Sequence, residues 1–435
     1  MQVLSPLDGR YASQVEVLRP YFSEQALMKA RVEVEVRYFI TLSRLDGVRE
    51  LKAVNKAQEK ALLGLVDGFN DRAYQRIKEF EKVTKHDVKA VEYYIKEKAA
   101  KISGLKASLE FVHFGLTSED VNNLAYGLLI HGALKSVIIP SLTSFQRELQ
   151  KLARRTKTIK MLSLTHGQPA TPTTLGKEMM VFIARLEHQF KQLKRGSLNG
   201  KLGGAVGNFS AHRSAYPDVD WEKFRGKFVR SLGLIPLAFT TQINPHDDLA
   251  ELSHLMSRIN TILLGFSRDV WMYISRGIFG QKVIKGEVGS SAMPHKVNPI
   301  DFENAEGNFG LSTALFGHFA EKLPVSRLQR DLSDSTVQRN IGVAFGYHLL
   351  AIRSLIKGLA KLSVNRVQIQ RELDAHPEVI AEAIQTVLRK NGVSGAYEKL
   401  KALTRGEKVT QEDLEVFIAN LEIPKAERER LLGMF

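Results

Sequence analysis

The feature that most constrains the fold is a succession of five long helical stretches in the middle of the chain. Apolar spacing and the residues that start and stop helices predict long helices over about 117–155, 172–196, 244–275 and 299–321, and a fifth beginning near residue 330. Pro140 is expected to break or kink the first helix, because proline lacks a backbone N–H. Few strands are predicted anywhere. Helices of this length bury their apolar faces against one another, so the sequence predicts an all-α fold with a central bundle.

Shorter helices are expected on both sides of this bundle. The pattern predicts helices over about 23–44, 52–67 and 69–82 after an irregular arm, and short charged helices beyond residue 363. Thr84 is expected to cap a further helix, with Asp87 in the third helical position. We therefore predict an N-terminal helical domain over 1–108, a central bundle over 109–362 and a C-terminal helical domain over 363–435.

The composition narrows the class of protein. The 435 residues carry a formal net charge of +15 and contain no cysteine. The absence of cysteine excludes thiolate chemistry and fits a reducing compartment, so we expect a cytoplasmic protein. No uninterrupted apolar run is as long as a membrane span, and no membrane partner is expected. The positive charge is spread along the chain and suits an enzyme that attracts anionic small molecules, although a nucleic-acid-binding scaffold is an alternative.

The stretch from Gly286 to Pro299, GEVGSSAMPHKVNP, combines residue types that suit a ligand site. Its glycines make the chain conformationally permissive, and Ser290 and Ser291 supply adjacent hydroxyls. Asn298 and Pro299 are typical of a helix start, and Lys296 stands just before it. A cation beside free N–H groups indicates a bound anion. A plain Gly/Ser linker is the alternative interpretation.

Two other helix starts carry the same signal. Thr117 and Asp120 form a capping box, and Ser118 adds a second hydroxyl to a cluster of free N–H groups that can hold a carboxylate. His86 and Asp87 combine a cap with a pair of side chains able to bind a substrate. In each case capping alone remains the structural alternative.

The remaining candidates are a histidine and a group of arginines. His166 lies in a polar connector, SLTHGQPATPTT (163–174), where a histidine near neutrality is a good proton donor. Arg330, Ser335 and Arg339 span the predicted first turns of the fifth helix and suit one phosphate, with salt bridges to Asp331 and Asp334 as the alternative. The glycine-rich segment 200–212 lacks the spacing of a phosphate-binding loop.

GSSAMPHKVNP resembles the signature of the fumarase/aspartase superfamily, whose members release fumarate from succinyl compounds. The blocks LSPLDGRY, KHDVKAVEYY, FVHFGLTSEDVNN, THGQPATPTTLGKEM, TTQINPHD and LPVSRLQRDLSDSTVQRN are similar, in order, to the members that cleave succinylated purine nucleotides, in their longer bacterial form. The resemblance runs from about Leu4 to Val343 and more loosely to the C-terminus.

The resemblance implies a role for each matching residue. Ser290 matches the base that takes a proton from the succinyl Cβ, and His166 matches the acid that protonates the departing nitrogen. The residues that match the end of the site that binds the succinyl carboxylates are Lys296, Asn298, Thr117, Ser118 and Gln242. The residues that match the phosphate site are Arg10, Tyr11, Arg330, Ser335 and Arg339. Further substrate contacts match His86, Asp87, Ser291 and Asn304, whereas Lys85 stands where Asn or Arg is expected.

The resemblance also implies a homotetramer with a shared helical core, active sites assembled from several subunits, and neither a metal nor an organic cofactor. The expected substrates are anionic nucleotides, with no nucleic acid bound. Another fumarate-releasing member of the superfamily, one that acts on argininosuccinate, is the alternative enzyme, and such an enzyme has no use for a phosphate clasp.

Overall fold

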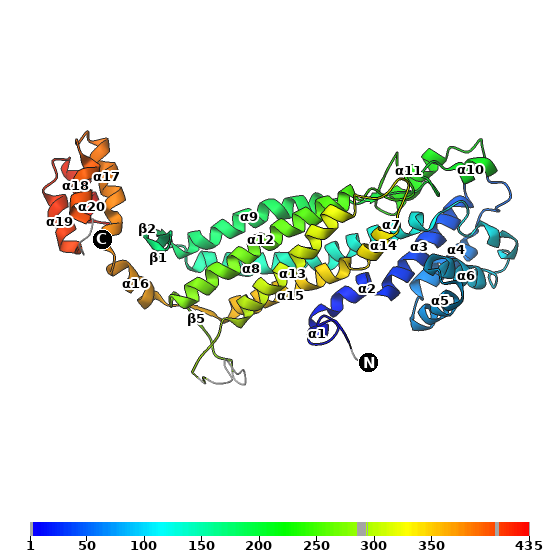
Figure 1. The fold of residues 1–435 in the computed structure, drawn as a ribbon, viewed down its shortest axis with the longest axis horizontal. Helices are drawn as coiled ribbons and strands as arrows, with labels where there is room; N and C mark the ends of the chain where they lie inside the picture. The colour runs from blue at the N-terminus through cyan, green and yellow to red at the C-terminus, as the bar shows by residue number, and fades with distance from the viewer. Residues whose placement is uncertain (1–2, 285–292, 294, 405–408, 435) are drawn as a thin grey trace. The chain divides into compact units, whose positions relative to one another are not determined.

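The computed structural model describes residues 3–284, 293, 295–404 and 409–434, and they are mostly helical (Figure 1). Two compact units account for the chain. The first, called unit 1 below, comprises Met1–Ser144, Glu187–Gly265 and Asn304–Ser354. The second, unit 2, comprises Phe145–Leu186, Phe266–Glu303 and Leu355–Phe435. Five long helices contribute residues to both units, and the division into three domains stays a prediction.

The N-terminal part of unit 1 contains the expected helices. After the short elements α1 (Ala12–Val15), η1 (Glu16–Leu18) and α2 (Arg19–Phe22), the main helices are α3 (Glu24–Leu42), α4 (Lys56–Asp67), α5 (Asp71–Thr84) and α6 (Asp87–Ala99). The side chains of Ser23, Asn55 and Asn70 cap α3, α4 and α5 by accepting hydrogen bonds from backbone N–H groups. These helices were predicted from the apolar pattern, and the caps are local signals that lie close to the predicted starts.

The predicted cap of α6 was wrong. Thr84 is the last residue of α5, and Lys85 ends that helix in the left-handed conformation, with φ of 53°. His86 is the N-cap of α6, and its Nδ1 accepts a hydrogen bond from the backbone N–H of Lys89 at 3.2 Å. A lysine rarely adopts a positive φ, so the presence of Lys85 did not predict the end of α5 at this position.

The long helices occur nearly as predicted. The first is α7 (Ser118–Ala133), the π-helical turn η3 (Leu134–Ile138) and α8 (Ile139–Arg155). The others are α9 (Leu175–Arg195), α12 (Asp247–Ser275), α13 (Ile300–Lys322) and α15 (Ile341–Lys361). The π turn ends just before Pro140, where it accommodates the missing N–H without breaking the helix.

Four of these helix starts differ from the prediction, and one of them is that of α9, which begins at Leu175 because residue 172 still belongs to strand β2 (Gln168–Thr174). Helix α12 begins at Asp247 rather than near Asn244, because His246 has a φ of 60° that a helix excludes. Helix α13 begins at Ile300, one residue later than the Asn298–Pro299 start implied. The predicted fifth helix is preceded by a separate short helix, α14 (Ser333–Gln338), so Arg330 lies before any helix.

The connector that holds His166 is a β-hairpin, not an irregular loop. Strands β1 (Lys160–Thr165) and β2 (Gln168–Thr174) pair antiparallel around a two-residue turn of His166 and Gly167. Both turn residues have positive φ, 53° and 74°, as a type I′ hairpin turn requires. The two prolines in β2 masked the strand pattern, because proline is depleted in strands.

The remaining elements are small. Strand β3 (Asn199–Gly200) pairs parallel with β4 (Ile235–Pro236), and β5 (Phe279–Gln281) pairs antiparallel with β6 (Leu362–Val364). Helices α10 (Ser210–Ala215) and α11 (Trp221–Ser231) lie in unit 1. The last helices of unit 2 are α16 (Arg366–Asp374), η4 (Pro377–Ile380), α17 (Ala381–Lys390), α18 (Ala396–Thr404), α19 (Gln411–Ala419) and α20 (Lys425–Leu432). Side chains from η4 to α20 form a hydrophobic cluster of their own.

Two helices are long and apolar enough to cross a membrane by length and composition. They are Ser118–Arg155 and Ser333–Lys361, and 39% and 61% of their most apolar windows are buried within the chain. Core helices of soluble proteins satisfy the same criterion, so this finding does not place the protein in a membrane.

A buried polar chain joins three long helices within unit 1. His348 on α15 bonds through Nδ1 to Asn260 Oδ1 on α12 at 2.6 Å, and Asn260 Nδ2 donates to Ser312 Oγ on α13 at 3.0 Å. Ser312 Oγ in turn donates to the carbonyl oxygen of Ala344 at 2.9 Å. Because His348 is fully buried, burial lowers its pKa to about 3 and the imidazole stays neutral.

We predict that His348 makes the protein less stable in mild acid. The unfolded chain protonates this histidine near pH 6.5, whereas the folded chain does so only near pH 3, so acidification between these values favours unfolding. At pH 5 the cost is about 2 kcal/mol. In His348→Gln, the unfolding midpoint measured by calorimetry should fall less steeply between pH 6.5 and 5. His188→Gln, at an exposed position of α9, is the control and should keep the full slope; an equal slope in both variants would contradict the prediction.

Candidate functional site

The N-terminus of α7 is held by a buried carboxylate. Thr117 and Asp120 form the predicted capping box, in which Asp120 Oδ2 accepts a hydrogen bond from the Thr117 N–H at 2.9 Å. Thr117 and Ser118 are half-buried, whereas Asp120 is fully buried. The helix start therefore presents two hydroxyls from a fixed backbone, an arrangement suited to an anion.

Asp120 also organises the glycine-rich segment that follows β3. Its Oδ1 lies 2.8 Å from Lys201 Nζ, and both side chains have no exposed surface. The same carboxylate accepts hydrogen bonds from the N–H groups of Gly203 and Gly204 at 2.9 and 3.0 Å. Gly204 has a φ of 76°, which favours glycine. The segment that lacked a phosphate-loop spacing thus serves to enclose one buried ion pair.

Arg330 lies beside Gln242 and two buried carboxyl groups. Its Nη1 donates to Gln242 Oε1 at 3.2 Å, and its Nη2 lies 3.7 Å from Glu119 and 3.6 Å from Asp334. Gln242 is itself fixed by its Nε2, which donates to the carbonyl oxygen of Ala205 at 2.9 Å. The salt bridge to Asp334 is the alternative that the sequence left open for Arg330.

Burial changes the ionisation of this group. The pKa of Glu119 is raised to about 8. Burial is the largest cause and the nearby Asp334 is the second, whereas Arg330 acts in the opposite direction. Burial and the Arg330 charge lower the pKa of His246 to about 4. At neutral pH Glu119 is therefore mostly protonated, and His246 is a neutral imidazole.

The same residues are close enough to hold a metal ion. Ligand atoms of Glu119, His246 and Asp334 lie within 4.8 Å of one another. Arg330, 3.6 Å from Asp334, already supplies a positive charge at this position, which disfavours a second cation by repulsion. The expectation that the protein needs no metal stays a prediction.

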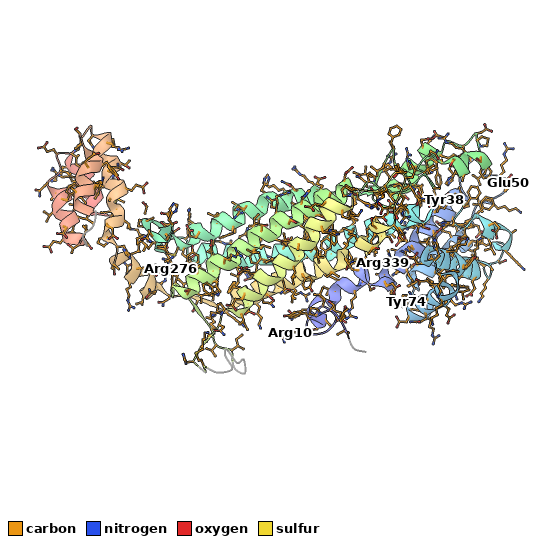
Figure 2. The ribbon with its side chains drawn as sticks, viewed as in Figure 1. Arg10, Tyr38, Glu50, Tyr74, Arg276 and Arg339 are labelled. Carbon is orange, nitrogen blue, oxygen red and sulfur yellow. The ribbon has the colours of Figure 1, made fainter. Side chains whose placement is uncertain are left out.

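Arg339 and Ser335 form a second polar group around α14. Arg339, labelled in Figure 2, donates from Nη1 to Ser335 Oγ at 2.8 Å and from Nη2 to Asp87 Oδ2 at 3.1 Å. The same Asp87 oxygen accepts from the buried Arg31 at 2.8 Å. Burial acts to raise the pKa of Asp87, but Arg31 and Arg339 outweigh it and the net shift is downward. The structure thus brings together two of the three residues predicted to clasp a phosphate, and gives Arg330 different partners.

The other predicted residues of unit 1 lie at exposed or half-buried positions. Arg10 is exposed and stands 5.8 Å from the ring centre of Tyr11, whose hydroxyl accepts a hydrogen bond from Asn304 at 3.3 Å. Lys85 and His86 are exposed between α5 and α6. These positions are accessible to a ligand.

Unit 2 holds the remaining described candidates. His166 is exposed at the hairpin turn between β1 and β2. Lys296 is exposed and Asn298 half-buried, just before α13. Val297, between them, accepts a hydrogen bond from Gln281 at 2.9 Å, which ties this segment to β5. Ser290 and Ser291 lie outside the residues that the structure describes.

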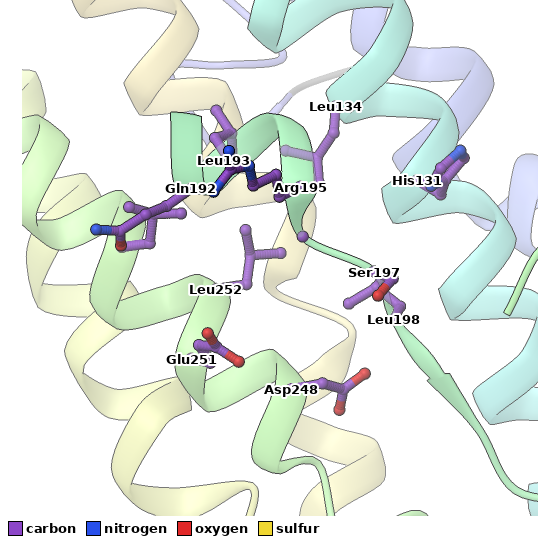
Figure 3. A pocket seen from close by; sticks show the side chains of 12 residues that line it. His131, Leu134, Gln192, Leu193, Arg195, Ser197, Leu198, Asp248, Glu251 and Leu252 are labelled. Carbon is purple, nitrogen blue, oxygen red and sulfur yellow. The ribbon is translucent and has the colours of Figure 1, made fainter. Parts of the chain in front are cut away.

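A separate pocket of about 370 Å³ lies in unit 1 between α7, α9 and α12 (Figure 3). Leucines such as Leu193 and Leu252 line it together with charged residues of both signs, including Arg195 and Glu251. None of the predicted site residues lines this pocket. Its mixed lining indicates no particular ligand.

The sequence named Asp334 only as a salt-bridge partner of Arg330, and it did not identify four other buried residues behind the predicted site, namely Arg31, Glu119, Lys201 and His246. Glu119 alone carried a signal, because a carboxyl group so near a predicted anion-binding helix start is unexpected. The others gave none, since their partners lie far away in the chain; Lys201 and Asn123, for example, bond across 78 residues.

Comparison with known proteins defines the class first. A family model described as a lyase matches residues 9–311. A fumarate lyase from Mesorhizobium has a similar fold, with a TM-score of 0.76 over 96% of this chain and 92% of the other at 18% identity. A β-carboxy-cis,cis-muconate cycloisomerase from Acinetobacter calcoaceticus gives a TM-score of 0.74 over 97% and 95% at 16% identity. The fold is therefore that of the all-helical lyases, as expected.

The particular family follows from closer relatives. A model described as adenylosuccinate lyase C-terminal matches residues 326–435. Adenylosuccinate lyases of Legionella pneumophila and Escherichia coli are 52% and 51% identical to the chain, each over 100% of it and 95% of the relative. That of Dictyostelium discoideum is 51% identical over 98% and 93%. The chain belongs to the adenylosuccinate lyase family and is a carbon–nitrogen lyase.

We predict that Asp120→Asn strongly destabilises the fold. The substitution leaves the Lys201 ammonium buried without a counter-charge, which costs about 3–5 kcal/mol. Chemical denaturation should report this loss, and the double variant Asp120→Asn, Lys201→Met should regain part of it. Glu148→Gln, in an exposed pair with Lys151 at 2.7 Å, is the matched control and should change stability by less than about 1 kcal/mol. A comparable, small effect at both sites would show that the buried pair is not needed.

Proposed function

We propose that the protein cleaves adenylosuccinate to AMP and fumarate. The observation that carries this proposal is sequence identity. Over the whole chain, 52% and 51% of the residues are identical to those of two proteins named adenylosuccinate lyase. The separate arginines of unit 1 support it, because the substrate carries a dicarboxylate at one end and a phosphate at the other. Guanidinium groups are well suited to both kinds of anion.

The proposed reaction is an anti β-elimination without a covalent intermediate. Ser290 removes the proton from the succinyl Cβ, the electron pair forms the carbon–carbon double bond, and the bond to the purine nitrogen breaks. His166 gives a proton to that departing nitrogen. Charge builds up on the carboxylate beside the carbanion, and donors aimed at it lower the barrier. Two such donors lie at the start of α13, a helix of 23 residues. Lys296 stands just before the helix, and the free N–H groups of its first turn are the second source of donors.

The position of His166 suits a general acid. It stands at the tip of a hairpin, exposed rather than packed in a core, and the type I′ turn fixes its backbone. A serine hydroxyl is a weak base in water, so Ser290 requires a closed, cation-rich site to be activated.

The same site is proposed to cleave the succinylated aminoimidazole carboxamide ribotide (SAICAR) to AICAR and fumarate. Both compounds carry a succinyl group on an amine and a ribose phosphate, so one acid, one base and two anion sites serve for both. The enzyme would then act in purine and AMP biosynthesis.

We infer that the enzyme works as a homotetramer in the cytoplasm, with each active site drawing residues from several subunits. Large apolar side chains are exposed on the long helices, which supports burial against further copies; they are Met180, Val181, Trp271, Met272 and Leu311. The lack of cysteine supports a reducing compartment.

We predict that the purified protein releases fumarate from adenylosuccinate and from SAICAR. Loss of absorbance by the substrate, with enzymatic measurement of fumarate, provides the assay. Argininosuccinate should not be cleaved, because it carries no phosphate. Failure to form fumarate from adenylosuccinate at saturating concentration would refute the proposed function.

We predict that His166→Asn and Ser290→Ala each lower turnover by about 100-fold or more, because each removes a proton-transfer group. Asparagine is chosen at position 166 because it tolerates the positive φ of the turn. Ser291→Ala should lose far less than Ser290→Ala, and His188→Asn, at an exposed position of α9, should keep full activity. Near-normal turnover in His166→Asn or Ser290→Ala would remove that residue from the mechanism.

A further inference from the structure

A second pocket, of about 410 Å³, lies in unit 2 at the C-terminal end of α8. Its volume falls within the range of about 300–1,000 Å³ that is typical of small-molecule sites. The floor of the pocket is apolar, since Leu152, Leu359 and Leu362 line it and are only 3%, 8% and 5% exposed. Four cations also line it, and they are Lys151, Arg154, Arg155 and Lys282. None of the residues predicted for the substrate site lines this pocket.

Two separate segments bring these cations together. Helix α8 is amphipathic, so Ala153 is buried whereas Arg154 and Arg155 beside it are exposed. The negative end of the helix dipole favours basic side chains in the last turn, which explains these two arginines but not Lys282. Lys282 follows β5, and its backbone N–H donates to the carbonyl oxygen of Lys361 at 2.8 Å. The pairing of β5 with β6 thus continues up to the residue that supplies the fourth cation.

The cations of this pocket outnumber its anions. Glu148 is the one carboxylate in the lining, and its Oε1 lies 2.7 Å from Lys151 Nζ. Arg155 and Lys282 make no side-chain hydrogen bond or ion pair with any residue that the structure describes. Like charges that are gathered in one place repel one another, so an anion bound among them lowers the electrostatic free energy.

This face of the chain is expected to stay accessible when several copies assemble. The exposed apolar side chains assigned above to contacts between copies lie on α9, α12 and α13. Helices α8 and α15, which line the pocket, are described over their whole lengths, and neither exposes a large apolar side chain. Their outer surface therefore resembles one that remains in contact with water.

We propose that this pocket binds a chain of two or more phosphate groups, as carried by nucleoside triphosphates and by inorganic polyphosphate. Four cations and one carboxylate leave an excess of three positive charges, whereas one phosphate group carries only about −1.5 to −2 at neutral pH. Guanidinium groups bind phosphate oxygens through paired hydrogen bonds, and lysine adds a compact charge. The site goes beyond the proposed function and does not depend on it, because the two share no residue.

Calorimetric titration of the intact protein with tripolyphosphate tests this site. Tripolyphosphate should bind at least about 10-fold more tightly than orthophosphate, because a single phosphate reaches fewer of the cations. In Arg155→Gln and in Lys282→Gln, the Kd for tripolyphosphate should rise about 10-fold, since each variant loses a charged hydrogen-bond donor. ATP separates the two sources of the ligand. A lower Kd for ATP than for tripolyphosphate identifies a nucleotide, and an equal or higher one identifies the inorganic chain.

Arg389→Gln is the matched control, because Arg389 is also exposed in the last turn of a helix of unit 2, α17. It should leave the Kd for tripolyphosphate unchanged, as should Arg339→Gln, which removes a cation from the predicted phosphate site. Circular dichroism should show that all four variants are folded, since the substituted side chains are exposed.

Three results would overturn the proposal. An equal loss of affinity in Arg389→Gln would show that exposed cations bind the probe in general. Loss of binding in Arg339→Gln, with full binding in Arg155→Gln, would place tripolyphosphate at the substrate site. Orthophosphate that binds as tightly as tripolyphosphate would contradict the proposed class of ligand.

Discussion

The ion pair between Asp120 and Lys201 is the interaction on which the polar part of unit 1 depends. Neither side chain has any exposed surface, and a charge in such a place is tolerated only when it is paired and hydrogen-bonded. Asp120 meets this condition by accepting from Lys201, from the Thr117 N–H and from two glycine N–H groups. One carboxylate thereby fixes both the start of α7 and the segment that carries Ala205, the partner of Gln242.

Around this pair the chain balances its buried charges locally, although its net charge is +15. Arg330 lies between two carboxyl groups, and Arg339 shares Asp87 with Arg31. Each guanidinium is thus oriented by a carboxyl group that holds it in place. Cations that are already oriented favour the binding of an anionic ligand. The free energy needed to orient them is spent when the chain folds and does not reduce the binding free energy.

The sequence predicted those features that depend on neighbouring residues. The capping box of Thr117 and Asp120 was found because its two members lie three residues apart, and the long helices because apolar spacing repeats within each of them. Prediction failed where the backbone adopts a rare conformation. Lys85, His166 and His246 all have positive φ, and these residues respectively end α5, form the hairpin turn and delay α12. Lysine and histidine do not predict this, because glycine and asparagine are the residues that commonly adopt a positive φ.

The sequence by itself determined the mostly helical class and the family, because these rest on local periodicity and on short motifs, and it supplied a set of candidate site residues. Tertiary structure alone decided which partners from distant parts of the chain those residues meet. Arg330 and Gln242 are 88 positions apart, and Asn123 and Lys201 are 78 apart. Pairing over such distances is set by how helices pack and by which charges burial forces together, and neither is encoded in the spacing of residues along the chain.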